Sequence, residues 1–239
     1  MLAWIARGLR IGIVTTRYPR APEPAPPGFR GRIEPIGAGP SELAALCLTG
    51  AIAVSDGVVA VDRRRCILCG ACVEAAPEVF RFVPEYETAS AEALRQPLGE
   101  RVRALRRSVH IRQVDAGSDG SEEWEIAALT NPYYDLQRLG LFFTAAPRHA
   151  DILLVTGGVT TAMAEPLRRA WEVMPEPKAI VAAGTDACSG GFAATTGEVA
   201  GGVDKVLPVD VYVPGSPPSP IALLHGLLLA VGKLVEATT

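Results

Sequence analysis

Three cysteines spaced three residues apart constrain this chain more than any other feature of its sequence. Cys66, Cys69 and Cys72 stand in the run C-I-L-C-G-A-C, and Cys47 precedes this run by 19 residues. A C-x2-C-x2-C loop can wrap a small inorganic cluster with three thiolates, while the fourth ligand comes from elsewhere in the chain. Gly70, between the second and third of these cysteines, can take a positive φ and bring backbone close to sulfur. We therefore predict one 4Fe–4S cluster, held by these four cysteines.

Structural zinc and disulfides are the alternative uses of such cysteines. Zinc prefers paired C-x2-C knuckles, which three cysteines in one run fit less well. Disulfides are disfavoured because the close run suits thiolate ligation and because no secretory signal is expected at the N-terminus. The fifth cysteine, Cys188, has no sequence partner, which suits a reducing compartment.

Length and charge exclude several classes of protein. The 239 residues leave room for one large domain or two modest ones. The net charge of −3 argues against nucleic-acid binding. No apolar run reaches the length needed to span a bilayer.

The first 32 residues are predicted to form an amphipathic basic helix followed by a proline-rich strap. Leu2, Trp4, Ile5 and Leu9 fall on one helical stripe, and residues 1–32 contain six arginines and one acidic residue. This composition favours peripheral contact with an anionic membrane surface, with packing on a partner protein as the alternative. The run P-R-A-P-E-P-A-P-P-G that follows is typical of an extended polyproline segment, which can cross a surface and deliver the next module to a fixed place.

From residue 109 onward, apolar strand-like runs alternate with helical patterns. The expected strands are 109–114, 152–155, 179–183 and 206–213, and the expected helices are 123–129, 161–173, 191–202 and 219–236. This alternation predicts an α/β domain with a mostly parallel four-stranded sheet. Sheets of this kind bind ligands at the carboxyl ends of their strands, where the loops D-A-G-S-D-G-S-E-E, A-G-T-D-A-C-S-G-G and P-G-S-P-P stand.

Two parts of the chain resemble two neighbouring subunits of one class of membrane complex. The runs L-T-N-P-Y-Y-D-L-Q-R-L-G, P-R-H-A-D-I-L-L-V-T-G-G-V-T and V-D-K-V-L-P-V-D-V-Y-V-P-G-S-P-P-S-P resemble the small electron-transfer subunit of group 4 membrane-bound nickel–iron hydrogenases, and equally the quinone-proximal iron–sulfur subunit of complex I. This resemblance covers about residues 108–235. The runs G-I-V-T-T-R-Y-P and F-R-G resemble the start of the ferredoxin-type subunit of the same machines.

The resemblance implies a fusion with four segments. These are the helix and strap at 1–32, a single-cluster ferredoxin-like α+β module at 33–85, a linker helix at 86–107, and a flavodoxin-like α/β domain at 108–239. A two-cluster ferredoxin would also carry cysteines at the positions of Gly37, Pro40, Leu43 and Ala76. Because all four ligands of one cluster are missing and all four of the other remain, we expect one retained cluster.

The α/β domain departs from its family at the terminal cluster. The positions of the four family cysteines hold Asp119, Glu122, Asp186 and Ser216, and Cys188 lies two residues beyond one of them. Sulfide-bridged iron needs thiolate ligands, so we predict no cluster in this domain. This set of four residues, the degenerate site, has two possible interpretations. It is an empty scaffold whose polar side chains bond to turn amides, or its three acids bind a hard cation such as magnesium, calcium or manganese. A partner's arginine would neutralise the acids equally well.

The resemblance implies an electron-transfer subunit of a hetero-oligomeric, membrane-associated complex at the cytoplasmic face of the cell membrane. The expected partners are a large hydrogenase-like or complex I-like catalytic subunit and membrane-arm subunits, with no nucleic acid. We expect no catalytic residue in this chain. The alternative is a non-redox connector between a membrane ion-translocating arm and a soluble partner, in which the cluster staples a small module. A free soluble ferredoxin is disfavoured because such a carrier needs no second domain.

Overall fold

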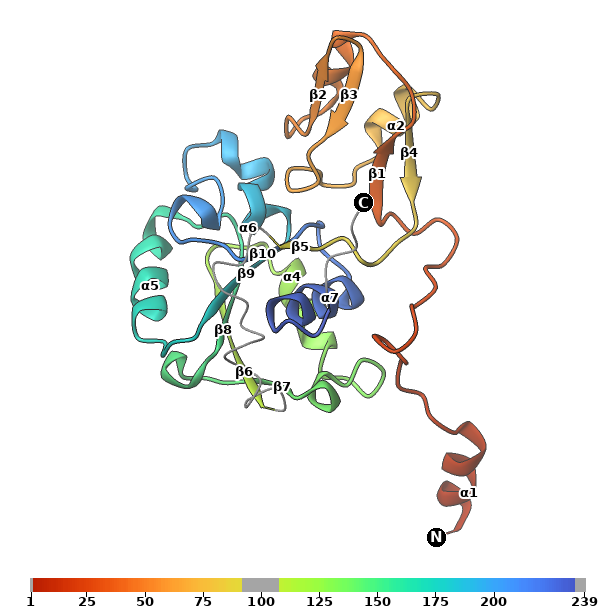
Figure 1. The fold of residues 1–239 in the computed structure, drawn as a ribbon, viewed down its shortest axis with the longest axis vertical. Coiled ribbons are helices and arrows are strands. Elements are labelled where there is room, and N and C mark those ends of the chain that lie inside the picture. The colour runs from red at the N-terminus through yellow and green to blue at the C-terminus, as the bar shows by residue number, and fades with distance from the viewer. Residues whose placement is uncertain (1, 92–107, 235–239) are drawn as a thin grey trace.

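The computed structural model describes residues 2–91 and 108–234. The chain forms a small cysteine module and a larger α/β domain, with helix α1 standing apart from both (Figure 1). Among the described residues, no helix is long and apolar enough to cross a membrane.

The N-terminal arm, residues 12–31, connects α1 (Leu2–Ile11) to the cysteine module and runs along the α/β domain on the way. The Thr16 amide donates to the Tyr133 carbonyl at 2.8 Å, and the Glu23 carboxylate accepts from the hydroxyls of Thr16 and Tyr133. Tyr18 is 1% exposed and packs into the core of the α/β domain. These contacts fix the course of the arm along the α/β domain.

The cysteine module, residues 33–85, consists of two antiparallel strand pairs with short helical turns. The pairs are β1 (Arg32–Pro35) with β4 (Phe80–Val83), and β2 (Ile52–Ser55) with β3 (Val58–Val61). The turns are η1 (Ser41–Leu46) and α2 (Ala71–Ala75). Ile33, Ile52 and Phe80 belong to a small core in which Cys47, Cys66 and Cys72 also lie. The cysteine positions are therefore part of the packing of this module.

The α/β domain is built on one six-stranded sheet. Its strands are β5 (Ser90–Ala91), β6 (Val109–Asp115), β7 (Leu141–Phe143), β8 (Ile152–Thr156), β9 (Ala179–Ala183) and β10 (Val211–Val213). The spatial order is β5-β10-β9-β8-β6-β7, and all neighbours are parallel except β5, which pairs antiparallel with β10. Counted along the chain, the parallel strands have the order 2-1-3-4-5, as in flavodoxin-like folds.

Helices cover both faces of this sheet (Figure 1). They are α4 (Ser121–Ala128), α5 (Thr161–Glu172), α6 (Thr185–Ser189) and α7 (Pro220–Ala230), with 3-10 turns η3 (Leu136–Leu139), η4 (Pro147–His149), η5 (Gly191–Thr195) and η6 (Val203–Lys205). In β8, Leu154 lies in the core layer that includes α7, whereas Leu153 and Val155 lie in the layer that includes Leu167 of α5. Because both faces are buried, this strand is continuously apolar rather than alternating.

The predicted four-stranded sheet is wrong in number, although the parallel arrangement is confirmed. The sequence did not indicate the strands β5 and β7. They have two and three residues, and such short strands show no periodicity of apolar residues. The linker-helix prediction for residues 86–107 is wrong at residues 90–91, which form β5, and its part from 92 to 107 lies outside the described residues.

The helix predicted at residues 191–202 is also wrong. Only the 3-10 turn η5 forms there, because Gly197, Gly201 and Gly202 take positive φ angles that end a helix. The strand expected at 206–213 forms only at its last three residues, since Leu207 still closes the turn of η6 and Pro208 has no amide hydrogen to donate. The helices expected at 123–129, 161–173 and 219–236 form as α4, α5 and α7, the first beginning two residues earlier and the last ending at Ala230.

Candidate metal centre

The fold brings Cys47, Cys66, Cys69 and Cys72 to one small cavity. Its other walls are mainly apolar and come from both strand pairs, with lining residues Ile33, Leu46, Leu48, Thr49, Ala51, Ile52, Val61 and Ile67. Cys72 is buried, Cys47 and Cys66 are half-buried, and Cys69 is exposed. A cavity lined by four thiols with few competing polar groups fits the donor set of an iron–sulfur cluster.

Local backbone conformation explains how one short loop turns three cysteines inward. Gly70 has φ 88° and stands immediately before α2, which carries Cys72. The angle favours glycine, and a Cβ here would crowd the Phe82 ring at 3.1 Å. Leu68 also has a positive φ, of 56°, so Cys69 lies between two residues in the left-handed region.

The thiols interact with one another and with backbone amides. Burial raises the pKa of Cys66 to about 11, and the proximity of the Cys72, Cys47 and Cys69 sulfurs adds to this rise. At Cys47 burial also acts upward, but hydrogen bonds from Thr49 and from the amides of Ala51, Thr49 and Ile52 outweigh it and lower the pKa. The Ala51 amide donates to Cys47 Sγ at 3.2 Å. Amides directed at sulfur stabilise thiolate, which is the form that binds metal.

No three His, Cys, Asp or Glu side chains converge on a single point suitable for one metal ion anywhere in residues 2–91 and 108–234. A 4Fe–4S cluster has a different requirement. Each of its four thiolates binds a separate iron, so the sulfurs surround a body of some size rather than meeting at one ion.

The cysteine loop is docked on the carboxyl-terminal edge of the α/β sheet. Thr185, which follows β9, is fully buried and donates its hydroxyl to the Cys66 carbonyl at 3.0 Å. The same hydroxyl accepts from the Gly215 amide at 3.3 Å, and the Thr185 amide donates to the Gly215 carbonyl at 2.7 Å. One threonine thus joins the cysteine loop to the loops after β9 and β10.

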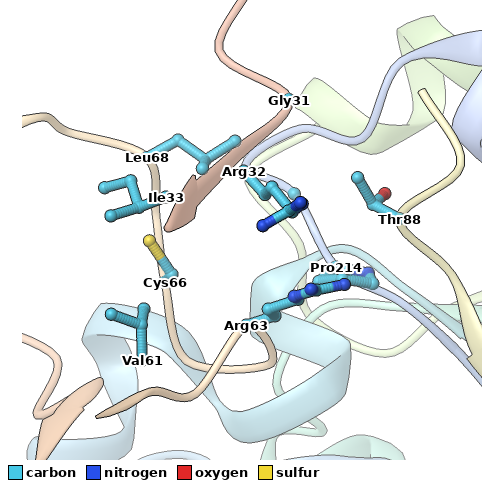
Figure 2. Close-up of a pocket in the computed structure, with 10 residues that line it drawn as sticks. Gly31, Arg32, Ile33, Val61, Arg63, Cys66, Leu68, Thr88 and Pro214 are labelled. Atoms are coloured by element: carbon cyan, nitrogen blue, oxygen red, sulfur yellow. The ribbon is translucent and has the colours of Figure 1, made fainter. Parts of the chain in front are cut away.

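Arginines reinforce this junction. The Arg64 guanidinium carbon lies 5.0 Å from the centroid of the Tyr212 ring, a cation–π contact between the two domains. Figure 2 shows Arg63 extending toward Pro214 beside Cys66, whose sulfur points instead toward Ile33. Sequence reasoning singled out the loop that contains Thr185 but not its contact with Cys66, because that contact joins residues 119 positions apart.

The four residues predicted to stand at the cluster site of the α/β domain are only partly brought together. Glu122 is 1% exposed on α4, Asp186 is half-buried on α6, and Asp119 and Ser216 are exposed. Asp119 acts electrostatically on both Glu122 and Asp186, so these three acids are neighbours. Ser216 forms no described contact with them.

Side-chain oxygens accept hydrogen bonds from the turn amides after β6. Asp115 Oδ1 accepts from the amides of Gly117 and Ser118, both at 2.8 Å. Ser118 Oγ accepts from the Gly120 amide, and Asp119 Oδ1 accepts from the Ser121 amide. These turn amides therefore bond to side chains of the same loop. In the described part of the chain, the three acids do not form a group arranged to hold one metal ion.

Burial and the nearby carboxylates shift the pKa values of the acids. Burial raises the pKa of Glu122 to about 7, and the carboxylates of Asp186, Asp119 and Glu123 add to the rise. Burial, followed by the charge of Asp119, also raises the pKa of Asp186. Asp119 differs because hydrogen bonds from Ser121 lower its pKa.

The strand order and the two covered faces define the second domain as a doubly wound α/β domain, here carrying a cysteine module at its ligand-binding edge. Residues 120–230 match the family described as NADH ubiquinone oxidoreductase, 20 Kd subunit, and residues 61–108 match the 4Fe-4S single cluster domain of Ferredoxin I. The second match includes Cys66, Cys69 and Cys72 but begins after Cys47.

Curated relatives agree with the first match. The chain is 38% identical to the probable membrane-bound hydrogenase subunit mbhJ of Pyrococcus furiosus, over 60% of this chain and 86% of that protein. It is 43% identical to an uncharacterized protein of Methanocaldococcus jannaschii, over 54% of this chain and 87% of that protein. The chain therefore belongs to the NADH ubiquinone oxidoreductase 20 kDa subunit family, with a ferredoxin-type domain at its N-terminal side.

Formate hydrogenlyase subunit 7 of Escherichia coli is 44% identical over 56% of this chain, but the chain spans only 53% of that protein. Two solved structures also align. One is the membrane-bound sulfane sulfur reductase, an archaeal respiratory membrane complex, with 30% identity, TM-score 0.47, and coverage of 54% of this chain and 75% of the other. The second is an NAD+-reducing [NiFe]-hydrogenase, with 19% identity, TM-score 0.46, and coverage of 55% and 96%.

The first prediction concerns the threonine at the junction. Thr185→Val should lower stability by about 1–3 kcal/mol, because it leaves the part-buried Cys66 carbonyl and the buried Gly215 amide without their hydroxyl partner. The thermal unfolding midpoint and hydrogen exchange at the Gly215 amide measure the effect. Thr185→Ser keeps the hydroxyl and should restore both. A valine variant as stable and as protected as the wild type would contradict this role.

The second prediction concerns pH. The Glu122 pKa of about 7 lies above its ordinary value of 4.5, so the folded state binds an extra proton between these values and stability falls as pH rises through them. Glu122→Gln removes this penalty. It should be more stable than the wild type by up to about 3 kcal/mol near pH 8, with the gain vanishing near pH 4.5.

Thermal midpoints at several pH values test this expectation, with the exposed Glu198→Gln as control. A Glu122→Gln variant whose midpoint runs parallel to that of the wild type at every pH would show that Glu122 is ionised without penalty.

Proposed function

We propose that this chain is the electron-transfer subunit of a membrane-associated complex related to group 4 hydrogenases and complex I, with one 4Fe–4S cluster on Cys47, Cys66, Cys69 and Cys72. The observation that carries the proposal is the single cavity lined by these four cysteines. The matched ferredoxin-type domain, which contains three of them, supports the same cofactor.

The residues around the cavity suit a one-electron carrier. When bound, a 4Fe–4S cluster supplies reversible storage of one electron. The apolar walls keep water from most of the cavity, and the amide of Ala51 stabilises the Cys47 thiolate. Cys69 is exposed, and Leu48, which lines the same cavity, is 74% exposed. Electrons would therefore exchange most readily on the side of these two residues, since transfer is favoured where the cluster lies closest to a partner.

The α/β domain is proposed to hold no cluster. Asp119, Glu122, Asp186 and Ser216 offer only oxygen at the former thiolate positions, and oxygen ligands do not sustain a 4Fe–4S cluster. The hydrogen bonds that Asp115, Ser118 and Asp119 accept from the turn amides support a site completed by its own side chains. Electrons would then leave through the cysteine module rather than through the second domain.

The proposed setting is a hetero-oligomeric complex at the cytoplasmic face of the membrane, with a large hydrogenase-like or complex I-like subunit and membrane-arm subunits. Helix α1 supports peripheral contact, because Trp4 and Leu9 are 70% and 81% exposed beside Arg7 and Arg10. The similar subunit of Pyrococcus furiosus is named as part of a membrane-bound hydrogenase.

A structural connector is the second candidate function. The small core of the cysteine module favours this function, since modules of this size commonly need a bound structural metal to be stable. The contacts of Thr185 and of Arg64 also join the module firmly to the α/β domain. The two functions differ in whether the cluster accepts an electron at a physiological potential, which an EPR-monitored reductive titration determines.

The third prediction tests the ligand set. Cys66→Ser and Cys47→Ser should each lose most of the iron and the EPR signal of the anaerobically purified protein, because serine oxygen is a poor ligand for sulfide-bridged iron. Cys188→Ser is the matched control. Cys188 is a residue of α6 and its side chain is buried in the core, so its variant should keep the full iron content. Full iron in Cys47→Ser would remove Cys47 from the ligand set.

A further inference from the structure

Arg30, near the end of the N-terminal arm, reaches the cysteine loop with its side chain. Its Nη1 donates to the carbonyl oxygens of Leu68 and Cys69, at 3.1 and 3.0 Å. The guanidinium carbon lies 5.0 Å from the centroid of the Phe82 ring, which also packs against Gly70. A single cation thus holds two consecutive carbonyls of the loop and stacks on the aromatic ring beneath it.

These two hydrogen bonds fix the orientation of two peptide planes. In a trans peptide the amide N–H points opposite to the carbonyl, so holding the carbonyls of Leu68 and Cys69 directs the N–H groups of Cys69 and Gly70 away from Arg30. Leu68 and Gly70, on either side of Cys69, both have left-handed φ angles in this arrangement. Hydrogen bonds from loop amides to the sulfurs are one of the factors that set the potential of an iron–sulfur cluster.

Arg30 also differs from the neighbouring arginines in its ion pairing. Arg32 pairs with Glu34 and Glu85, and Arg81 pairs with Glu34. Arg30 forms no ion pair among the described residues, and its donated hydrogen bonds go to neutral carbonyls. A positive charge that is not held in an ion pair, placed beside a cofactor that becomes more negative on reduction, favours the reduced form.

We propose that Arg30 is a positioning residue for the cluster, which holds the peptide planes of the cysteine loop and raises the reduction potential of the bound cofactor. This inference rests on the proposed function, because it presupposes a cluster on the four cysteines. It assigns to the N-terminal arm a role in redox chemistry in addition to its structural one.

The test compares Arg30→Met, Arg30→Lys and the control Arg81→Met in the full chain, by iron content and by EPR-monitored redox titration. Arg30→Met should retain iron, and its equilibrium constant for reduction should be about threefold lower than that of the wild type. At about 59 mV per tenfold for one electron, this is a midpoint about 28 mV lower. Arg30→Lys keeps the charge, so its midpoint should stay close to that of the wild type. The midpoint of the control Arg81→Met should match that of the wild type.

Equal midpoints for Arg30→Met, Arg81→Met and the wild type would overturn the proposal. If Arg30→Met fails to hold iron, Arg30→Lys decides, because lysine keeps the charge but cannot hold both carbonyls in the geometry of the planar guanidinium. It should release iron to a chelator faster than the wild type, and an unchanged rate would overturn the positioning role. A wild-type chain without iron would contradict the proposed function itself, a result distinct from both of these.

Discussion

The hydrogen bond from Thr185 to the Cys66 carbonyl is the contact on which the arrangement of the two domains depends. It joins the loop that carries three cysteines to the end of β9, and the same hydroxyl accepts from the amide of Gly215 after β10. Doubly wound sheets bind their ligands at this edge. In this chain the group bound at the edge is a loop of the chain's own N-terminal module, which brings the four-cysteine cavity close to the degenerate site.

This docking also bears on the proposal that the α/β domain holds no cluster. Glu122 is buried beside the loop that contains Thr185, since a Cβ at Gly184 would lie 2.4 Å from Glu122 Oε1. The carboxyl group of Glu122 is thus packed against backbone, and the turn amides donate hydrogen bonds to Asp115, Ser118 and Asp119. Because these polar groups bind one another, the proposed redox chemistry rests on the cysteine module.

The sequence was most informative where chemistry or burial leaves few choices. The spacing of Cys66, Cys69 and Cys72 restricts the loop to wrapping a common centre, and the continuous apolar runs of β8 and β9 indicate strands buried on both faces. Strands β5 and β7 were missed because two or three residues show no period. The contacts of Arg30 and Thr185 were missed because they join residues far apart in the chain, and neither residue type predicts its partner.

The amount of iron and acid-labile sulfide per chain, measured on anaerobically purified protein, tests the central claim most directly. The account predicts about four irons and four sulfides, all held by the cysteine module. About eight irons per chain would contradict it, because a second cluster would then occupy the α/β domain despite its oxygen side chains. Zinc in place of iron would contradict the redox function altogether.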